Sequence, residues 1–197
     1  MPRLFIISGC NGAGKTTASY TFLPKQLDCA EFINSDEFAK SLSPFDPDAA
    51  SIMAGKYMLM KMEYLSKKRK DFGIESTLAT RSLKATIRLA QENGYTVTIM
   101  YLWLRSPELA IQRVNARINL GGHKVQEETV RRRYRSGLIN FFTEYRDLCD
   151  NWIFADNSDM KMQIVAEGSA RGITVYDVQK WLEIRRSLLK ETESDKT

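Results

Sequence analysis

Short apolar runs alternate along the chain with longer segments in which apolar residues recur at helical spacing. Strands are predicted at five of these runs: Leu4–Ser8, Glu31–Asn34, Phe72–Ile74, Thr96–Leu104 and Trp152–Ala155. Strands that alternate with helices are typical of parallel sheets joined by right-handed crossovers. The pattern therefore predicts an α/β fold, with a doubly wound, mainly parallel five-stranded sheet flanked by helices.

Helices are predicted between and after these strands. The first begins at Lys15 and is broken at Pro24, and a long one opens at Asp46-Pro47, where Asp can cap the helix and Pro fits its first turn. Further helices are predicted at Leu83–Glu92, from Ser106-Pro107 to the break at Gly121-Gly122, at Glu127–Cys149, and in a last amphipathic segment with Val178, Trp181, Leu182 and Leu188. No internal repeat or low-complexity segment interrupts this alternation.

The long second helix carries an apolar stripe. Met53, Tyr57, Met60 and Tyr64 recur there at helical spacing. Such a stripe is more typical of a core-facing helix surface than of a ligand site. The sequence therefore predicts that these four side chains pack into the core.

The length of the chain, 197 residues, suits one α/β domain with a sizeable core. A single domain is predicted over residues 1–190, followed by a polar tail over 191–197. Within the domain, Met162–Tyr176 is predicted to form a C-terminal hairpin around Gly168.

Composition indicates a soluble globular protein, with 43% hydrophobic and 27% charged residues. No apolar run approaches the ~20 residues that a membrane span needs, and the apolar start Leu4–Ile7 is too short for a signal peptide. The three cysteines, Cys10, Cys29 and Cys149, are scattered and odd in number, which favours neither a metal cluster nor a disulfide framework. A reducing cytoplasm is therefore the expected location.

The net charge of +5 has two interpretations. One is binding to nucleic acid, and the other is attraction of anionic small molecules such as nucleotides. The second is favoured because the arginines cluster near motifs that handle phosphate.

One motif points directly to phosphate. The segment Gly9–Thr16 satisfies G-x-x-x-x-G-K-[ST] after a predicted strand and before a predicted helix. In such a P-loop the glycines let backbone N–H groups point at phosphate oxygens, and the helix N-terminus adds partial positive charge. Lys15 is expected to neutralise the β- and γ-phosphates of ATP, and Thr16 to hold Mg²⁺ through its hydroxyl.

Acidic residues follow two of the predicted strands, where ligands of open α/β sheets bind. Asp36 follows the second strand and is the candidate base that accepts the proton of an attacking hydroxyl. The alternative for Asp36 is a helix N-cap. Glu75 follows the third strand, and we expect it to position the acceptor or the metal together with Thr77. The motifs together predict transfer of the γ-phosphoryl group to a hydroxyl of a small molecule.

Arginines surround a glycine pair in the second half of the chain. Arg113 and Arg117 share a helix face, and Arg131, Arg132, Arg133 and Arg135 follow Gly121-Gly122-His123. A glycine-hinged lid over residues 113–135 is therefore predicted to close over the triphosphate. Arg117, Arg132 and Arg135 are the candidates for function, whereas Arg131 and Arg133 are interpreted as a solvated basic face.

These motifs, taken in order, resemble those of the zeta-toxin-like kinases in a short stand-alone form. The resemblance extends from the first strand to about Ser158, and Gly-Gly-His and Arg-Arg-Tyr are its most specific parts. It rests on Ser8–Thr17, Asn34-Ser35-Asp36-Glu37, Glu75-Ser76-Thr77, Tyr101–Leu104, Ala110–Arg117, Gly121–Val125, Arg132-Arg133-Tyr134 and Asp156-Asn157-Ser158.

The resemblance implies a P-loop kinase fold and an acceptor such as UDP-N-acetylglucosamine, the nucleotide sugar that well-known members phosphorylate. It implies that Asp36 deprotonates the sugar hydroxyl and that Arg113 or Arg117 acts in the transition state. It also implies an antitoxin as a protein partner. This chain departs from the family at Cys10, where proline is common.

The site residues follow from the motifs and the resemblance together. ATP is expected to contact the P-loop positions Gly9, Asn11, Gly12, Ala13, Gly14, Lys15, Thr16 and Thr17, and also Arg132 and Asn157. The acceptor is expected to contact Asp36, Glu75, Thr77 and Arg81. Two alternative functions remain: a nucleotide or nucleoside kinase, and a nucleic-acid-binding ATPase or polynucleotide end kinase.

Overall fold

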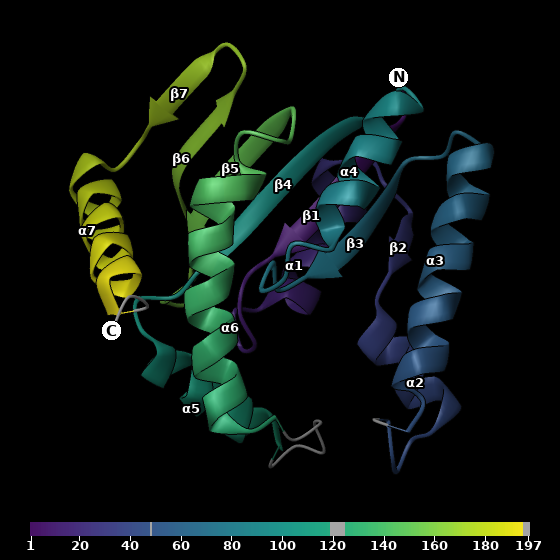
Figure 1. The fold of residues 1–197 in the computed structure, drawn as a ribbon, viewed down its shortest axis with the longest axis horizontal. Helices are drawn as coiled ribbons and strands as arrows, with labels where there is room; N and C mark the ends of the chain where they lie inside the picture. The colour runs from purple at the N-terminus through teal and green to yellow at the C-terminus, as the bar shows by residue number, and fades with distance from the viewer. Residues whose placement is uncertain (48, 119–124, 195–197) are drawn as a thin grey trace.

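A computed structural model describes residues 1–47, 49–118 and 125–194. Its strands form one sheet in the order β2-β3-β1-β4-β5-β6-β7 (Figure 1). The strands are β1 (Arg3–Ser8), β2 (Glu31–Ile33), β3 (Phe72–Ser76), β4 (Thr96–Trp103), β5 (Asn151–Asp156), β6 (Gln163–Ser169) and β7 (Gly172–Val175).

Helices connect most of these strands, as the alternating pattern predicts. They are α1 (Lys15–Gln26), α2 (Ser35–Leu42), α3 (Ser51–Lys67), α4 (Leu83–Glu92), α5 (Pro107–Ile118), α6 (Glu127–Asn140), the π-helical segment η1 (Phe141–Tyr145) and α7 (Val178–Ser194). The last helix thus continues past the point where the sequence predicts the tail to begin. None of the helices in the described part of the chain has the length and apolar character needed to cross a lipid bilayer.

Strands β1 to β5 pair in parallel, which confirms the predicted sheet. The strand order changes direction at β1, because β3 and β4 are its two neighbours. Ser8, the last residue of β1, is paired with Ser76 on one side and Tyr101 on the other. Loops that leave the carboxyl ends of these strands therefore meet where open α/β sheets bind their ligands.

Both faces of the sheet are buried, and consecutive residues of one strand belong to different cores. Leu4 and Ile6 of β1 lie in the core beneath α3, α4, α6 and α7. Phe5 and Ile7 lie in the core beneath α1 and α5. Figure 1 shows α4 and α6 in front of the sheet and α1 behind it. This two-sided burial explains why the strand sequences are continuous apolar runs.

A C-terminal hairpin extends the sheet, as predicted, but its turn differs from the prediction. Strand β6 runs antiparallel to β5, and β7 runs antiparallel to β6 with Ser169 paired to Gly172. The turn is therefore at residues 170–171, and Gly168 lies within β6. A Cβ atom at Gly168 would lie 2.4 Å from Cζ2 of Trp152, so glycine is needed there for close packing on the indole ring rather than for a turn.

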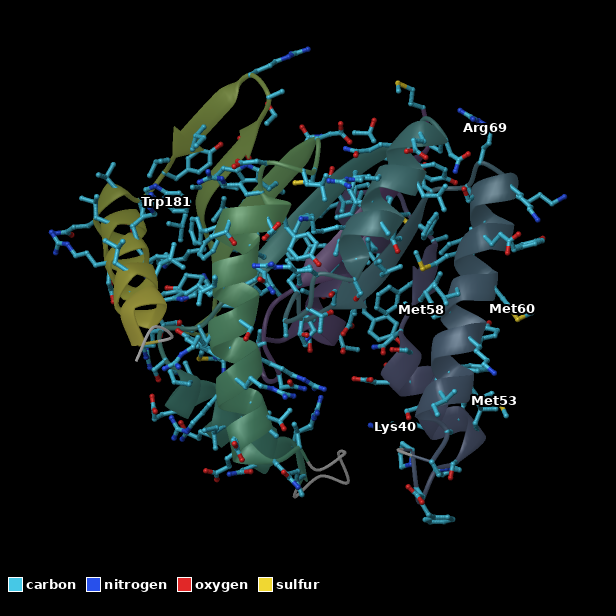
Figure 2. The ribbon with its side chains drawn as sticks, in the orientation of Figure 1. Lys40, Met53, Met58, Met60, Arg69 and Trp181 are labelled. Carbon is cyan, nitrogen blue, oxygen red and sulfur yellow. The ribbon has the colours of Figure 1, made fainter. Side chains whose placement is uncertain are left out.

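The prediction for the apolar stripe of α3 is wrong. Met53, Tyr57, Met60 and Tyr64 are 38 to 69% exposed. Figure 2 shows Met53 and Met60 pointing away from the rest of the molecule, whereas Met58 points towards the sheet. The buried face of α3 instead carries Ala54, Met62 and Leu65. The helix has two apolar stripes, and the sheet edge beneath it covers only one of them.

Three predicted helix boundaries are also wrong. Pro24 does not break α1, because it lies in the last turn, where the loss of one backbone hydrogen bond has little effect. Asp46 and Pro47 form a turn before α3, in which Asp46 Oδ1 accepts from the Ala49 N–H at 3.3 Å. The helix predicted to reach Cys149 changes at Phe141 into the π-helical segment η1.

Candidate active site

The glycines of the P-loop adopt backbone conformations that other residues rarely do. Gly9, Gly12 and Gly14 have φ values of 139°, 80° and 83°. A Cβ atom at Gly9 would lie 2.4 Å from the Leu102 carbonyl oxygen, and one at Gly12 would lie 2.6 Å from that of Ala110. The loop therefore needs glycine at these positions both for its turn and for close packing.

Two side chains from distant parts of the sequence hold the P-loop in place. The Asn157 side-chain amide, just after β5, donates to the Ala13 carbonyl oxygen at 2.8 Å. Arg133 of α6 donates to Asn11 Oδ1 at 3.1 Å. The loop thus has a fixed shape before any phosphate binds, which lowers the entropic cost of binding.

A cleft of about 990 Å³ opens in front of the P-loop. Its walls come from the P-loop and α1, from α2 and the start of α3, from the end of β3, and from α5 and α6. It is lined by Asn11, Gly12, Gly14, Lys15, Thr16, Thr17, Asn34, Ser35, Asp36, Glu37, Ala39, Lys40, Pro47, Ser51, Ala54, Glu75, Arg113, Arg117, Val125, Gln126, Thr129 and Arg133. This volume is large enough for a nucleotide and a second small molecule.

Lys15 is the lysine of the P-loop and lines the cleft. Its ammonium group donates to the Cys10 carbonyl oxygen at 3.0 Å. Burial lowers the pKa of this ammonium, and the nearby Glu75 and Asp36 carboxylates oppose that effect. A partly desolvated cation is a stronger partner for phosphate than a solvated one, because the local dielectric constant is low.

Glu75 is the most constrained carboxylate of the cleft. Burial raises its pKa, with Lys15 and a hydrogen bond from Thr16 opposing this effect and the Asp36 and Glu37 charges adding to it. Its Oε1 atom is buried, and no hydrogen-bond partner lies within reach among the described residues. A buried acceptor atom without a partner has a free-energy cost, so Glu75 is suited to receiving a hydroxyl or a metal-bound water.

Asp36 lies in the first turn of α2. The N-cap of this helix is Asn34, whose Oδ1 accepts from the Asp36 and Glu37 N–H groups at 2.9 and 3.2 Å. The N-cap interpretation of Asp36 is therefore wrong. The Asp36 side chain lines the cleft, and no hydrogen bond to its carboxylate occurs among the described residues. The carboxylate is thus available to an acceptor hydroxyl.

Three arginines line the opposite wall of the cleft: Arg113, Arg117 and Arg133. Arg113 also donates to the carbonyl oxygens of Asn157 and Ser158 at 2.8 and 2.7 Å, so it orders the loop after β5. Arg132 is exposed and is not among the lining residues. The predicted lid hinge, Gly121-Gly122-His123, lies outside the described residues.

Two residues expected to contact the acceptor lie outside the lining of the cleft. The Thr77 hydroxyl accepts from the Ala79 N–H at 3.4 Å, and Arg81 pairs with Glu144 at 3.1 Å. The segment that follows β3 is fixed by α6, because the Asn140 side chain donates to the Leu78 carbonyl oxygen at 2.8 Å.

The sequence predicts that Arg133 belongs to a solvated basic face, whereas the structure places it in the lining of the cleft. The signal that could have revealed it is a polar stripe: Gln126, Thr129 and Arg133, spaced by three and four residues, all line the cleft. Lys40 and Ser51 on the opposite wall carried no such signal.

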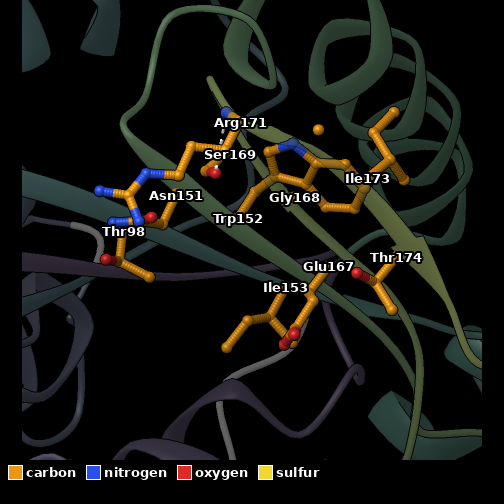
Figure 3. Close-up of a pocket in the computed structure, with 11 residues that line it drawn as sticks. Thr98, Asn151, Trp152, Ile153, Glu167, Gly168, Ser169, Arg171, Ile173 and Thr174 are labelled. Atoms are coloured by element: carbon orange, nitrogen blue, oxygen red, sulfur yellow. Dashed lines mark hydrogen bonds between the residues drawn. The ribbon is translucent and has the colours of Figure 1, made fainter.

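A smaller hollow of about 480 Å³ lies over strands β4 to β7 (Figure 3). Its lining includes Thr98, Asn151, Glu167 and Arg171. The Arg171 N–H donates to the Ser169 hydroxyl at 3.2 Å, so part of its polar lining is already satisfied. The hollow contains no P-loop and no paired carboxylates, and the chemistry is therefore assigned to the larger cleft.

The donor set of the larger cleft fits a magnesium ion that is bound mainly by substrate and water. Within the described ranges, no group of three or more His, Cys, Asp or Glu side chains could by itself hold a metal. The Thr16 hydroxyl and the unpartnered Glu75 oxygen lie next to the P-loop. Mg²⁺ in phosphoryl-transfer sites typically keeps several waters and takes one or two protein ligands together with phosphate oxygens.

The parallel sheet, the P-loop and the carboxylates facing it define a P-loop kinase. Comparison with known families makes this more specific, because the family model described as Zeta toxin matches residues 1–162. The chain therefore belongs to the zeta toxin family. An uncharacterized protein of Haemophilus influenzae is 33% identical over 127 residues, which cover 64% of this chain and 88% of that protein.

Solved structures share the fold at low sequence identity. A chain from the PezAT chromosomal toxin–antitoxin system of Streptococcus pneumoniae superposes with a TM-score of 0.69 and 18% identity, covering 98% of this chain and 87% of that one. A chain of the AvrRxo1-ORF1:AvrRxo1-ORF2 complex with sulphate ions gives a TM-score of 0.75 at 17% identity, covering 93% of this chain and 63% of that one. The same complex has also been solved with ATP. Family, fold and P-loop together make this chain an ATP-dependent phosphotransferase.

Proposed function

We propose that the protein transfers the γ-phosphoryl group of ATP to a hydroxyl of a small molecule, and that the favoured acceptor is a nucleotide sugar such as UDP-N-acetylglucosamine. The observation that carries this proposal is the available Asp36 carboxylate in the same cleft as Lys15 and Thr16. A carboxylate that faces a P-loop without a partner of its own is placed to accept a proton from a hydroxyl.

In this proposal, several residues of the cleft have roles in the reaction. Asp36 removes the acceptor proton as the hydroxyl oxygen attacks the γ-phosphorus, the bond from that phosphorus to the β,γ-bridging oxygen breaks, and ADP leaves. Lys15 and the P-loop N–H groups hold the β- and γ-phosphates, while Arg113, Arg117 and Arg133 stabilise the charge that spreads over the transferred group.

The remaining roles concern the metal, the base and the acceptor. Thr16 and Glu75 would hold Mg²⁺ directly or through water, and the ion would neutralise charge between the β- and γ-phosphates. Asn157, next to the P-loop, is proposed to lie near the nucleotide base. Contacts of the acceptor with Thr77 and Arg81, and a contact of ATP with Arg132, remain predictions from the resemblance.

Substitution of the proposed base tests the reaction. Asp36→Asn should retain ATP binding, because the P-loop is unchanged, and should lose phosphoryl transfer by about 10²–10⁴-fold. Lys15→Ala should lose both. Asp147→Asn serves as a matched control, since that carboxylate is 73% exposed and lies away from the cleft. If Asp36→Asn kept the full rate of phosphoryl transfer, the catalytic base would have to be another residue.

An acceptor screen tests the substrate. A metabolite extract incubated with ATP and the enzyme should yield a product heavier by one phosphoryl group, identifiable by mass spectrometry. UDP-N-acetylglucosamine should drive ADP release, whereas nucleoside monophosphates should not. The opposite result would support a nucleotide kinase.

We further propose a cytoplasmic location and an antitoxin-like protein partner. The support for a partner is the fold similarity to a chain from a toxin–antitoxin system. Co-purification of the chain with the product of a neighbouring gene would test it.

A further inference from the structure

The outer face of α3 carries an apolar stripe that the rest of the described chain leaves largely uncovered. Met53, Met60 and Tyr64 are 62, 69 and 60% exposed, and Tyr57 is 38% exposed. Tyr57 stacks on Phe38 of α2 at a centroid distance of 3.7 Å, so the centre of the stripe is held in place. In Figure 2, Met53 and Met60 lie on the side of α3 that faces away from the sheet.

We propose that this stripe is a contact between two copies of this chain, in which the two α3 helices pack antiparallel. The four residues are separated by four, three and four positions, the spacing of one seam of a coiled coil. That spacing is the same in either direction. A two-fold axis between Tyr57 and Met60 therefore places Met53 of each copy against Tyr64 of the other, and Tyr57 against Met60.

The charges beside the stripe agree with an antiparallel pair. Lys56 and Glu63 lie on one flank of the seam, and both are exposed. The same two-fold axis brings Lys56 of each copy opposite Glu63 of the other, which gives two ion pairs of opposite charge. Within one copy Glu63 pairs with the exposed Lys67 at 2.7 Å, a contact that is easily exchanged. If the two α3 helices packed in parallel, charges of the same sign would instead lie at the same height along the helix pair.

The size of the stripe sets the expected strength of this contact. Four side chains on one helix supply less than the roughly 800 Å² per partner that is usual for a stable complex. Ile52 and Leu59, which are 75 and 59% exposed, add apolar area on the flank of Lys56. The dimer is therefore expected to depend on concentration and to dissociate on dilution.

Analytical ultracentrifugation of the full chain over a concentration series tests the contact. We expect a reversible monomer–dimer equilibrium that Met60→Lys weakens by roughly tenfold or more, because a buried methionine is replaced by a charge. Leu89→Lys is the matched control, since Leu89 of α4 is 59% exposed and lies outside the stripe. A chain that stays monomeric throughout, or a dimer that Met60→Lys leaves unchanged, would overturn the proposal.

Charge reversal tests the direction of packing. Lys56→Glu and Glu63→Lys should each weaken the dimer by placing like charges across the two-fold axis, and the variant with both changes should recover it. Failure of the double variant to associate better than either single variant would count against the antiparallel arrangement.

Disulfide trapping gives a second test of direction. Mixing Met53→Cys with Tyr64→Cys under oxidising conditions should form a disulfide between the two variants, and neither variant should cross-link with itself. The native cysteines Cys10, Cys29 and Cys149 are buried and do not compete. Cross-linking of each variant with itself alone would indicate parallel packing and refute the proposal.

Discussion

The two carboxylates opposite the P-loop differ in their surroundings, and this difference assigns their roles. Asp36 is exposed at the start of α2 and free to accept a proton. Glu75 has a buried oxygen without a partner and a pKa raised by that burial. Carboxylates in one site that are held in different environments commonly divide the chemistry between them. These surroundings support the proposed roles, in which Asp36 is the base and Glu75 positions the metal or the acceptor.

The environment of Glu75 makes a prediction about stability. Because its folded-state pKa is raised, the ionised form destabilises the fold as pH rises through the ordinary carboxyl range towards that raised value. Glu75→Gln should therefore raise the melting temperature at pH 7.5 by a few degrees, on the order of 1 kcal/mol, and much less near pH 4. Differential scanning fluorimetry at the two pH values measures this. An equal rise in melting temperature at the two pH values would mean that ionisation of Glu75 is not the cause.

The sequence was sufficient to predict the two acids of the cleft and its arginines Arg113 and Arg117, but not Arg133. Asp36 and Glu75 follow strands, and parallel strands end at one edge, so both reach the cleft. The choice among Arg131, Arg132 and Arg133 depends on the rotation of α6 about its axis, which the packing of Val130 and Tyr134 sets. The structure brings Arg133 to the P-loop, whereas Arg131 pairs with Glu108 at 2.5 Å.

At the scale of elements, α7 reaches back to the nucleotide side of the molecule. Lys180 pairs with the buried Asp156 at 2.6 Å, and Asp156 also accepts from the Ser158 N–H at 2.9 Å. Burial alone would raise the pKa of Asp156, but the hydrogen bonds from Lys180 and Ser158 hold it below its usual value. Asn157, which donates a hydrogen bond to the Ala13 carbonyl oxygen of the P-loop, lies between Asp156 and Ser158.

Removal of that ion pair should loosen the loop. Lys180→Met leaves Asp156 buried without its cation, so we expect a loss of about 1–3 kcal/mol in stability and roughly tenfold weaker ATP binding. Lys180→Arg should retain both, and Asp156→Asn in the Lys180→Met background should restore stability. Arg186→Met, at an exposed position of α7, is the control. Calorimetric titration with ATP and thermal melts measure the effects.

The same pair predicts acid sensitivity. Because the folded-state pKa of Asp156 is lowered, its stabilising contribution is full above the ordinary carboxyl pKa and is lost as pH falls through the lowered value. As pH falls below about 4 and through that lowered pKa, the wild type should progressively lose its stability advantage over Lys180→Met, and an advantage that does not shrink with pH would contradict this account.

A close contact between α6 and the segment after β3 makes a further prediction. A Cβ atom at Gly137 would lie 2.4 Å from the Thr77 carbonyl oxygen, whereas Gly55 of α3 has nothing within 4 Å. Both lie within helices, where alanine is intrinsically better by about 0.5–1 kcal/mol. Gly55→Ala should therefore stabilise the protein and Gly137→Ala should destabilise it, as measured by urea denaturation. A gain in stability on Gly137→Ala would mean that the segment after β3 can move away from α6.

Element types could largely be predicted from the alternation of strands and helices, whereas the role of α3 could not. An apolar stripe indicates a buried surface without saying what covers it. Two stripes occur on α3, and the side that meets the sheet depends on the short edge strand β2. The position of the hairpin turn was missed for a related reason, because a glycine marks close packing as readily as a turn.

The whole molecule combines a net charge of +5 with one cleft lined by several cations. This charge should attract ATP electrostatically, so ATP affinity should fall modestly as salt rises. Binding of RNA or DNA should stay weak. Fluorescence anisotropy with labelled oligonucleotides over a salt series checks this, and tight binding with a steep salt slope would favour the nucleic-acid alternative.

The nucleotide site is assembled from residues that lie far apart along the chain. The P-loop lies within the first sixteen residues. Asn157, which donates a hydrogen bond to the Ala13 carbonyl oxygen, follows β5. The neighbouring Asp156 is paired with Lys180 of α7. During synthesis on the ribosome the P-loop emerges early, but its central strand pairs only after β3 and β4 have been made. A nascent chain should therefore bind ATP only weakly until α7 has left the exit tunnel and Lys180 has paired with Asp156.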